Sequence, residues 1–379
     1  MEKLRFGIVG MGVQGKLYAA LLTGRPFDGE TFPIPEGCEL TAVSSRSPET
    51  ADLAKNLGVK YFADWKEMLR SDICDAVMIT VPHYLHHEVA IFALEQGKHV
   101  LCEKPADVRA SDVEKMLAVR GDRALGMMLS MRTKPVFRKL KEIISSGELG
   151  SLRRSNWIIN AWWRPDSYYR SNAWRGTWAG EGGGIVVNQL PHQMDLWLEL
   201  CGMPEQVYCL AKEGAWRDIT VENDVTVTVK YPGGGTGVLI SCTHDPMGTD
   251  RLELCFDKGK ILVENSHKAT ICRFKKSEQE MNETIAPGGL GSLRPEELYT
   301  LEEFAAQQHF MEGYTEIFEN FAAHIHRGAP LIADGKDGLR QVQLANAIQL
   351  SGWKNMPISC PCNTEEYNAG LQEKIDTEK

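Results

Sequence analysis

The sequence contains no uninterrupted run of 18 apolar residues, so no segment has the length and hydrophobicity that a transmembrane helix needs. Basic residues are not in excess either, because 42 Lys and Arg stand against 51 Asp and Glu, a net charge of −9. Nucleic-acid-binding domains usually carry positive charge, so nucleic acid is not an expected partner. Residues 1–5 lead directly into an apolar segment without the hydrophobic core of a signal peptide, and we expect a cytoplasmic protein.

The ten cysteines form no pattern that is typical of a disulfide framework or a metal site. Most lie inside apolar runs, as reduced core cysteines do in large cytoplasmic proteins. Cys360 and Cys362 are separated by one residue, whereas redox and zinc pairs have two. His83, His86 and His87 lie close together, but we find no obvious carboxylate to complete a ligand set. The sequence therefore predicts no metal.

The 379 residues, 43% hydrophobic and 25% charged, have the composition of a soluble globular protein with two or three domains. In residues 1–130, short apolar runs alternate with helical patterns. This alternation predicts a Rossmann domain, a doubly wound parallel sheet flanked by helices. Strands are expected at 4–9, 40–44, 76–81, 99–102 and 124–129.

Residues 131–360 show a different pattern, in which strands follow one another with Gly, Pro or Asp between them. This pattern predicts an α/β domain with a large, mostly antiparallel sheet. Its closing helices, at about 311–327 and 338–351, could pack back on the first domain. Residues 361–379 are polar and charged, and we expect a loose tail.

A glycine-rich motif follows the first expected strand and begins the first expected helix, the context in which G-x-G-x-x-G indicates dinucleotide binding. The first glycine allows a tight turn, the second lets the backbone approach a pyrophosphate, and the third permits close helix packing. The helix N-terminus then faces the phosphates. The predicted pyrophosphate-binding residues are Gly10, Met11, Gly12, Val13, Gln14 and Gly15.

The second expected strand ends at Ser45 and Arg46, where many NAD enzymes offer an Asp or Glu to the ribose hydroxyls. A hydroxyl and a guanidinium suit the 2′-phosphate of NADP, which a carboxylate would repel. Alternatively, Arg46 stacks on the adenine and does not discriminate between the cofactors. These two residues favour NADP over NAD.

Two other expected strands also end in polar residues, at the sheet edge where ligands bind in such folds. Lys104 follows the strand at 99–102, and a lysine there can hydrogen-bond a substrate hydroxyl and help to transfer its proton. The alternative is an ordinary surface lysine. The predicted cofactor contacts at these strand ends are Thr80, Pro82, His83, His86, Glu103 and Lys104, with helix capping as the alternative for the histidines.

A triple glycine at 182–184 precedes Asn188, His192 and Asp195, whose spacing would place them along one face of a helix. A histidine that titrates near neutrality can accept the hydroxyl proton as hydride leaves the same carbon. Alone, such a histidine is more often a core residue. Together with Lys104 and a nucleotide-binding fold, His192 becomes a catalytic candidate.

Five of the nine tryptophans fall between residues 157 and 178, with Tyr and Arg residues among them. Aromatic rings stack on the C–H faces of sugars, and Arg and Tyr bind hydroxyls. Aromatic residues also form sheet cores and subunit interfaces, so we expect both roles in this segment. The predicted substrate contacts are Trp163, Arg164, Tyr169, Trp174 and Arg175.

These motifs in this order resemble the glucose–fructose oxidoreductase, inositol dehydrogenase and MocA (Gfo/Idh/MocA) family, over about residues 4–353. The resemblance implies a Rossmann domain followed by a domain whose open sheet usually forms dimers or tetramers, hence a homo-oligomer. It also implies that Lys104 and His192 are the catalytic pair. Many members have Asp where this chain has Asn188; an amide is no general base, so Asn188 would position a hydroxyl.

The resemblance further implies that Trp174 and Arg175 lie near the nicotinamide and that Arg132 faces the active crevice. The expected function is NAD(P)-dependent oxidation of a secondary alcohol in a sugar, glycoside or cyclic polyol. The tryptophans favour a glycoside, oxidised at C3, over inositol. Two interpretations remain open: a lyase or glycosidase that uses tightly held NAD transiently, and a nucleotide-binding regulator without turnover. A regulator needs neither Lys104 nor His192.

Overall fold

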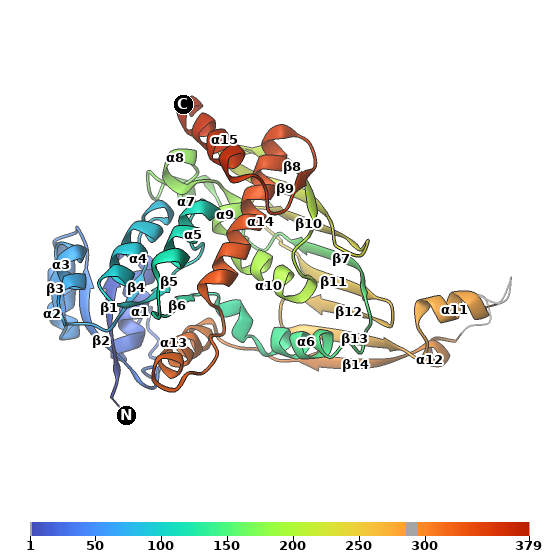
Figure 1. The fold of residues 1–379 in the computed structure, drawn as a ribbon, viewed down its shortest axis with the longest axis horizontal. Coiled ribbons are helices and arrows are strands. Elements are labelled where there is room, and N and C mark those ends of the chain that lie inside the picture. Colours follow the sequence, from blue (N-terminus) through green and yellow to red (C-terminus); the bar gives the residue numbers. More distant parts are fainter. Residues whose placement is uncertain (1, 286–293, 379) are drawn as a thin grey trace. The chain divides into compact units, whose positions relative to one another are not determined.

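The computed structural model describes residues 2–285 and 294–378 (Figure 1). The chain divides into two compact units, called unit 1 and unit 2 below. Unit 1 comprises Met1–Thr133, Gly180–Gly182 and His309–Gln343; unit 2 comprises Lys134–Ala179, Gly183–Gln308 and Leu344–Lys379. In the described residues, no helix combines the length and the apolar character needed to cross a membrane.

Unit 1 is built on a six-stranded sheet in the order β3-β2-β1-β4-β5-β6, and every neighbouring pair is parallel. This is the strand order of a Rossmann fold, so the predicted fold class is confirmed for this part. The strands are β1 (Leu4–Val9), β2 (Cys38–Ser44), β3 (Lys60–Phe62), β4 (Ala76–Ile79), β5 (His99–Cys102) and β6 (Leu125–Met127).

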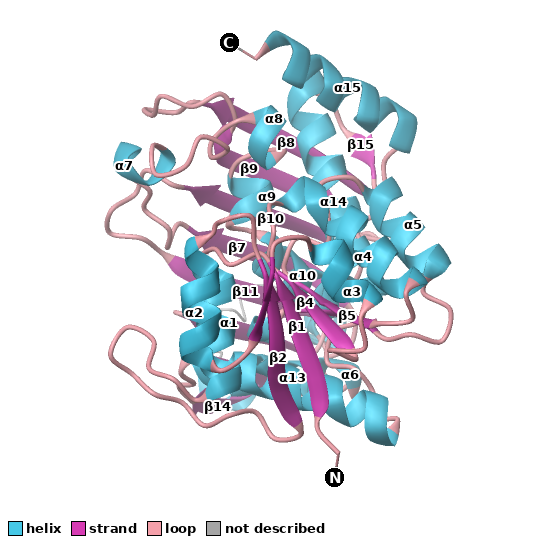
Figure 2. Cartoon of the chain, turned by 90° about the vertical axis from the view of Figure 1, so that its left-hand side faces the viewer, coloured by secondary structure: helices cyan, strands magenta, loops and turns pink. Residues whose placement is uncertain are grey.

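Helices cover both faces of this sheet, as Figure 2 shows for α1 and α2 on one side and α3 to α5 on the other. The two apolar clusters contain Phe6 and Ile8 of β1 on one face and Val9 on the other. The helices are α1 (Val13–Thr23), α2 (Glu49–Leu57), α3 (Trp65–Arg70), α4 (His86–Glu95) and α5 (Ala110–Val119), with short 3-10 turns at His83–Leu85 and Ser130–Thr133.

A distant helix, α13 (Phe310–Arg327), completes the first of these clusters. The ring of Phe318 packs edge-on against that of Phe6, with centroids 5.1 Å apart, and Phe321 lies beside them. The sequence analysis places this helix in the second domain but allows it to pack back. Its apolar side covers the face of β1 that would otherwise meet water.

Unit 2 is built on a nine-stranded sheet in the order β14-β13-β12-β11-β7-β10-β9-β8-β15. Among the strands that the structure describes here, only β7 and β10 pair in parallel, so the predicted mostly antiparallel sheet is confirmed. The strands are β7 (Leu152–Ile159), β8 (Gln206–Glu213), β9 (Glu222–Lys230), β10 (Thr236–Cys242), β11 (Asp250–Phe256), β12 (Gly259–Glu264), β13 (Lys268–Phe274), β14 (Tyr299–Ala305) and β15 (Ile358–Ser359).

The helices of unit 2 include two long ones, α6 and α10, drawn against the sheet in Figure 1. Short helices follow β7, in the tryptophan-rich segment and at the triple glycine. The helices are α6 (Pro135–Ser145), α7 (Asp166–Tyr169), α9 (Ile185–Asn188), α10 (Pro191–Cys201), α11 (Glu278–Thr284) and α12 (Pro295–Leu298); α8 (Trp178–Glu181) and α14 (Gly335–Lys354) contribute to both units.

Residues 364–377 form a helix, α15 (Thr364–Thr377), where the sequence analysis expects a loose tail. Asn363 caps its first turn, and Tyr367 and Leu371, four residues apart, are both buried. The ring of Tyr367 stacks on that of Trp353, with centroids 5.4 Å apart. These buried side chains, together with an ion pair from Lys374 to Glu213 at 2.6 Å, hold an otherwise polar helix against the rest of unit 2.

Candidate cofactor and substrate sites

The glycine-rich loop between β1 and α1 has a backbone that other residues could not adopt without strain. Gly10 has a φ of +99°, and a Cβ there would lie 2.8 Å from the backbone carbonyl of Thr80. A Cβ at Gly15 would lie 2.0 Å from the carbonyl oxygen of Gly10. At Gly12, by contrast, a Cβ would meet nothing within 4 Å. Gly10 and Gly15 close the turn, and Gly12 faces open space.

That open space lies at the N-terminus of α1, where Gly12 is the N-cap and no side chain caps the helix. The first turn of α1 has no acidic residue that would repel an anion. Uncapped N–H groups at a helix N-terminus bind phosphate oxygens. The residues present therefore fit the pyrophosphate of a dinucleotide at Gly10–Gly15.

Thr80 supports this loop from the end of β4. Its hydroxyl donates to the carbonyl oxygens of Val9, at 3.1 Å, and of Gly10. At the end of β2, the hydroxyl of Ser45 accepts a hydrogen bond from the backbone N–H of Ser47, and Arg46 is exposed. The predicted ribose-binding pair thus follows β2 directly, with the guanidinium accessible to a ligand.

Two predicted cofactor residues make backbone contacts inside unit 1. His86 is buried, and its two ring nitrogens lie 2.8 Å from the carbonyl oxygens of Val81 and Pro105. His83, also buried, lies 3.0 Å through Nδ1 from the carbonyl oxygen of Glu181. His86 thereby ties the end of β4 to the segment after Lys104, a structural role that both its nitrogens serve.

The histidine-rich stretch does have carboxylate neighbours, which the sequence analysis missed. His87, Asp107 and Asp112 place one ligand atom each within 4.8 Å of one another. A hydrogen bond to Asp107 raises the pKa of His87, and Lys115 forms an ion pair with Asp112 at 2.7 Å. The ammonium group of Lys115 offsets part of the negative charge that would attract a cation to this cluster. That the protein binds no metal stays a prediction.

Glu103 and Lys104 follow β5. The Glu103 carboxylate is buried and accepts hydrogen bonds from the hydroxyl of Tyr18 and, at 2.9 Å, from the backbone N–H of Lys104. Burial, the largest cause, raises the pKa of Tyr18 well above its usual value. A neutral tyrosine therefore donates to Glu103 at neutral pH. Glu103 holds the backbone at Lys104, whose side chain is half-buried.

Asn188 and His192 belong to two helices rather than to the single one that the spacing predicts. α9 ends at Asn188 and α10 begins at Pro191, which has no N–H to continue the hydrogen bonding. Both side chains are partly exposed, whereas Asp195 is buried. The partial exposure leaves Asn188 and His192 accessible to a ligand.

A tyrosine that the sequence analysis did not select, Tyr168, gathers three predicted substrate residues around it. Its hydroxyl accepts hydrogen bonds from Arg175 and, at 3.3 Å, from Asn188. The guanidinium carbons of Arg164 and Arg175 lie 4.8 and 4.3 Å from the centroid of its ring. The predicted Tyr169 is instead buried, with its hydroxyl 3.0 Å from that of Thr243.

Three other predicted substrate residues make contacts of their own. Trp163 is half exposed and lines a separate open hollow of about 190 Å³ with Asp245 and Asn265. Trp174 lies beneath the guanidinium of Arg175, with 4.7 Å from the guanidinium carbon to the ring centroid. In unit 1, Arg132 is buried and bonds Asp337 at 3.0 Å, so its guanidinium serves an internal ion pair.

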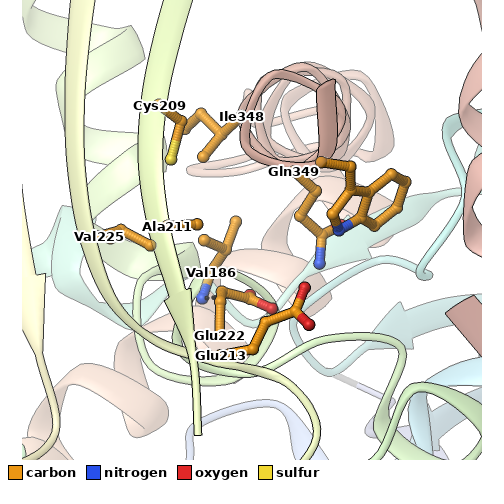
Figure 3. A pocket seen from close by; sticks show the side chains of 9 residues that line it. Val186, Cys209, Ala211, Glu213, Glu222, Val225, Ile348 and Gln349 are labelled. Atoms are coloured by element: carbon orange, nitrogen blue, oxygen red, sulfur yellow. Dashed lines mark hydrogen bonds between the residues drawn. The ribbon is translucent and has the colours of Figure 1, made fainter. Parts of the chain in front are cut away.

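A buried carboxyl group supports the segment that carries Asn188. Glu222 accepts hydrogen bonds through Oε1 from the backbone N–H groups of Gly184, at 3.0 Å, and Val186, at 3.3 Å. Figure 3 shows its side chain beside Glu213 in the lining of a small pocket. Burial raises the pKa of Glu222 to about 7. No sequence signal marks Glu222, because its partners lie 36 and 38 residues away.

Known protein families match both parts of this fold. Residues 4–125 match the model of the oxidoreductase family with an NAD-binding Rossmann fold, and residues 137–262 match the Gfo/Idh/MocA C-terminal domain. The chain is 25% identical over 362 residues to a myo-inositol 2-dehydrogenase from Thermotoga maritima, covering 92% of this chain and 96% of the relative.

Two further similarities extend this picture. A scyllo-inositol 2-dehydrogenase (NADP(+)) from Bacillus subtilis is 27% identical over 306 residues, 75% of this chain and 85% of the relative. The WlbA dehydrogenase from Bordetella pertussis, solved with NADH and UDP-GlcNAcA, superposes with a TM-score of 0.76 at 23% identity, covering 96% of this chain and 100% of the other. The chain belongs to the Gfo/Idh/MocA family of oxidoreductases, with an NAD-binding Rossmann fold.

Proposed function

We propose that this protein is an NAD(P)-dependent dehydrogenase that oxidises a secondary alcohol of a sugar, glycoside or cyclic polyol. The observation that carries the proposal is the loop at Gly10–Gly15, with open space at Gly12 and an uncapped helix N-terminus. The substrate class is supported by the relatives named as inositol dehydrogenases and by the aromatic and arginine side chains around Tyr168.

The proposed catalytic roles belong to three residues. Bound cofactor would accept hydride from the carbinol carbon. His192 takes the hydroxyl proton, and Lys104 holds the oxygen and favours the developing charge. Asn188 cannot accept a proton as a base, and it orients a hydroxyl instead. The hydrogen bond from Asn188 to Tyr168 fixes the direction of its amide.

We infer a preference for NADP from Ser45 and the exposed Arg46 after β2, where a carboxylate would repel a 2′-phosphate. The Bacillus subtilis relative is named as an NADP(+) enzyme. Replacing Arg46 with Ala should raise KM for NADP and leave KM for NAD nearly unchanged. Equal effects on both cofactors would instead support stacking of Arg46 on the adenine.

The first experiment follows the absorbance of the reduced nicotinamide with NAD and NADP separately. The substrates are myo-inositol, glucose, a simple β-glucoside and a nucleotide sugar. A rise in absorbance with one combination of cofactor and substrate supports a dehydrogenase and identifies both compounds. If no pair reacts, denaturing the protein and searching for released nucleotide tests for trapped cofactor. Release of aglycone without net cofactor change would overturn the proposal in favour of a lyase or glycosidase.

We also propose that the protein is a homo-dimer or homo-tetramer that associates through the sheet of unit 2. Ile158, Val238, Ile240 and Leu262 lie on one face of that sheet by register, and each is partly exposed. Apolar side chains on an exposed sheet face favour association with a second copy. Light scattering coupled to size exclusion tests this, and Ile240→Lys should shift the protein toward monomer.

A further inference from the structure

Arg164 and Arg175 of unit 2 pack against a tyrosine ring rather than against a carboxylate. Their guanidinium carbons lie 4.8 and 4.3 Å from the centroid of Tyr168. None of the ion pairs among the described residues includes either arginine. Arg170, in the same segment, does have an acidic neighbour, because a carboxylate oxygen of Asp166 lies 3.9 Å from its Nη1. Arg164 and Arg175 thus carry positive charge with which no carboxylate of the described residues forms an ion pair.

The hydrogen-bonding capacity of both guanidiniums is also largely unused. Arg164 donates through Nη1 to the carbonyl oxygen of Trp163 at 3.3 Å, and Arg175 donates through Nη1 to the hydroxyl of Tyr168. The Nε–H of each is shielded from solvent and has no acceptor. Buried donors without acceptors and charges without partners both cost stability. A ligand that brings negative charge to this place would offset that cost.

The surroundings reinforce the local positive charge. Arg217 donates through Nε to the carbonyl oxygen of Arg164 at 2.7 Å, which brings a third guanidinium to the same backbone. The whole chain carries a net charge of −9. This group of arginines without acidic partners is therefore a positively charged place on a negatively charged protein. An acidic protein that must attract an anionic ligand needs such a local reversal of sign.

We propose that Arg164 and Arg175 bind an anionic group carried by the substrate, a carboxylate or a phosphate, so that the enzyme acts on an acidic sugar derivative. The planar guanidinium binds either group through paired hydrogen bonds. The same Tyr168 hydroxyl that Arg175 contacts also accepts a hydrogen bond from Asn188, which connects the anion site to a predicted substrate residue. This inference rests on the proposed dehydrogenase function.

The test compares two substrates that differ only in charge, methyl β-D-glucopyranoside and methyl β-D-glucopyranosiduronate. Glucose and glucose 6-phosphate form a second pair for the phosphate. We expect kcat/KM to favour the anionic member of one pair by about 10- to 100-fold, through a lower KM. In Arg164→Gln and in Arg175→Gln, this ratio should fall toward one. Arg170→Gln is the matched control and should keep the wild-type ratio.

Direct binding separates this inference from the function on which it rests. Calorimetry with the two methyl glycosides needs no turnover, so a preference for the glucuronide that Arg164→Gln abolishes would support the anion site even in an inactive enzyme. A wild-type ratio near one in both pairs, with the neutral sugar oxidised, overturns the inference and leaves the dehydrogenase standing. Variants that lose NADH affinity, measured by nicotinamide fluorescence, while keeping the substrate ratio would overturn it in favour of the cofactor phosphates.

Discussion

The proposed cofactor loop of unit 1 and the proposed substrate cluster around Tyr168 in unit 2 are built by different means. At Gly10–Gly15, backbone atoms make the site, and a Cβ at Gly15 would lie 2.0 Å from the carbonyl oxygen of Gly10. Around Tyr168, side chains make the site. Arg175 and Asn188 donate hydrogen bonds to the Tyr168 hydroxyl, and the guanidiniums of Arg164 and Arg175 pack on its ring. The first site depends on the absence of side chains, and the second depends on their identity.

This difference determines how the two sites respond to amino-acid substitutions. The loop tolerates few substitutions at Gly10 and Gly15, because an added Cβ would collide there with the main chain. A side-chain site can change its ligand through single substitutions while the sheet beneath it stays the same. We therefore expect variants at Gly10 and Gly15 to lose cofactor binding and stability together, and variants around Tyr168 to change substrate preference first.

The largest effects should come from the proposed catalytic pair. His192→Asn and Lys104→Met should each lower kcat by about 100- to 10,000-fold, because each removes a group that holds or moves the hydroxyl proton. Steady-state kinetics with the best substrate measures this, and NADH fluorescence should show retained binding for His192→Asn. His326→Asn, at an exposed position in α13, is the control. A wild-type kcat in His192→Asn would remove this residue from the mechanism.

Glu222 allows a test of how strongly unit 2 depends on one buried side chain. Its folded pKa, about 7, lies above the ordinary value of 4.5, so folding favours the protonated form. In the unfolded chain, Glu222 loses its proton at a lower pH than in the folded protein. The free energy of unfolding should therefore fall as the pH rises from about 4.5 to about 7. Glu222→Gln keeps an acceptor for Gly184 and Val186 but does not ionise.

Thermal unfolding of both proteins at pH 5 and pH 8 measures this effect. At pH 8, Glu222→Gln should be more stable than the wild type by up to about 3 kcal/mol, the size that the raised pKa implies. At pH 5 the two should differ by much less. Parallel pH profiles of the two melting temperatures would contradict the prediction.

In the glycine loop, two alanine substitutions should separate folding from binding. Gly15→Ala should destabilise unit 1 by about 1–3 kcal/mol, because its Cβ collides with the backbone. Gly12→Ala adds a Cβ to open space and should cost less than about 1 kcal/mol. Both should weaken NADH binding. Melting temperatures and NADH fluorescence measure the pair, and equal melting temperatures would show that the loop is less rigid than its geometry implies.

The smallest effect should come from Glu378, which lies beyond α15. Its carboxylate accepts hydrogen bonds from the backbone N–H groups of Trp178, at 2.5 Å, and Ala179, at 3.0 Å. Glu378→Ala should lower stability by about 1 kcal/mol and raise substrate KM more than it lowers kcat, because it loosens the segment after Arg175. Glu373→Ala, on the exposed side of α15, is the matched control. A KM equal to the control's would limit Glu378 to a structural role.

The features that the sequence predicts well depend on neighbouring residues. The glycine loop, the alternation of strands and helices in unit 1 and the consecutive strands of unit 2 each follow from patterns within about 20 residues. The resemblance to the Gfo/Idh/MocA family is confirmed for the same reason, since its motifs are local. The roles of Lys104, His192 and Asn188 remain predictions.

Long-range contacts account for most of what the sequence analysis missed. Glu222 bonds backbone 36 and 38 residues away, and Tyr168 meets Asn188 across 20 residues. His87 meets Asp107 20 residues away, so the carboxylate neighbour of the histidine stretch was not visible. Polarity alone suggested a loose tail where α15 forms, because two buried side chains outweigh the many exposed ones.

By itself, the sequence determined which backbone could form at Gly10 and Gly15, since only glycine lacks the Cβ that would collide at these two positions. It also determined the two sheet types, through the period of its apolar residues. The tertiary structure alone decided three other features. Arg175 and Asn188 both bond the hydroxyl of Tyr168, the carboxyl group of Glu222 is buried, and Arg132 bonds Asp337. Steric exclusion acts between neighbours in the chain, whereas burial and charge pairing depend on residues that only folding brings together.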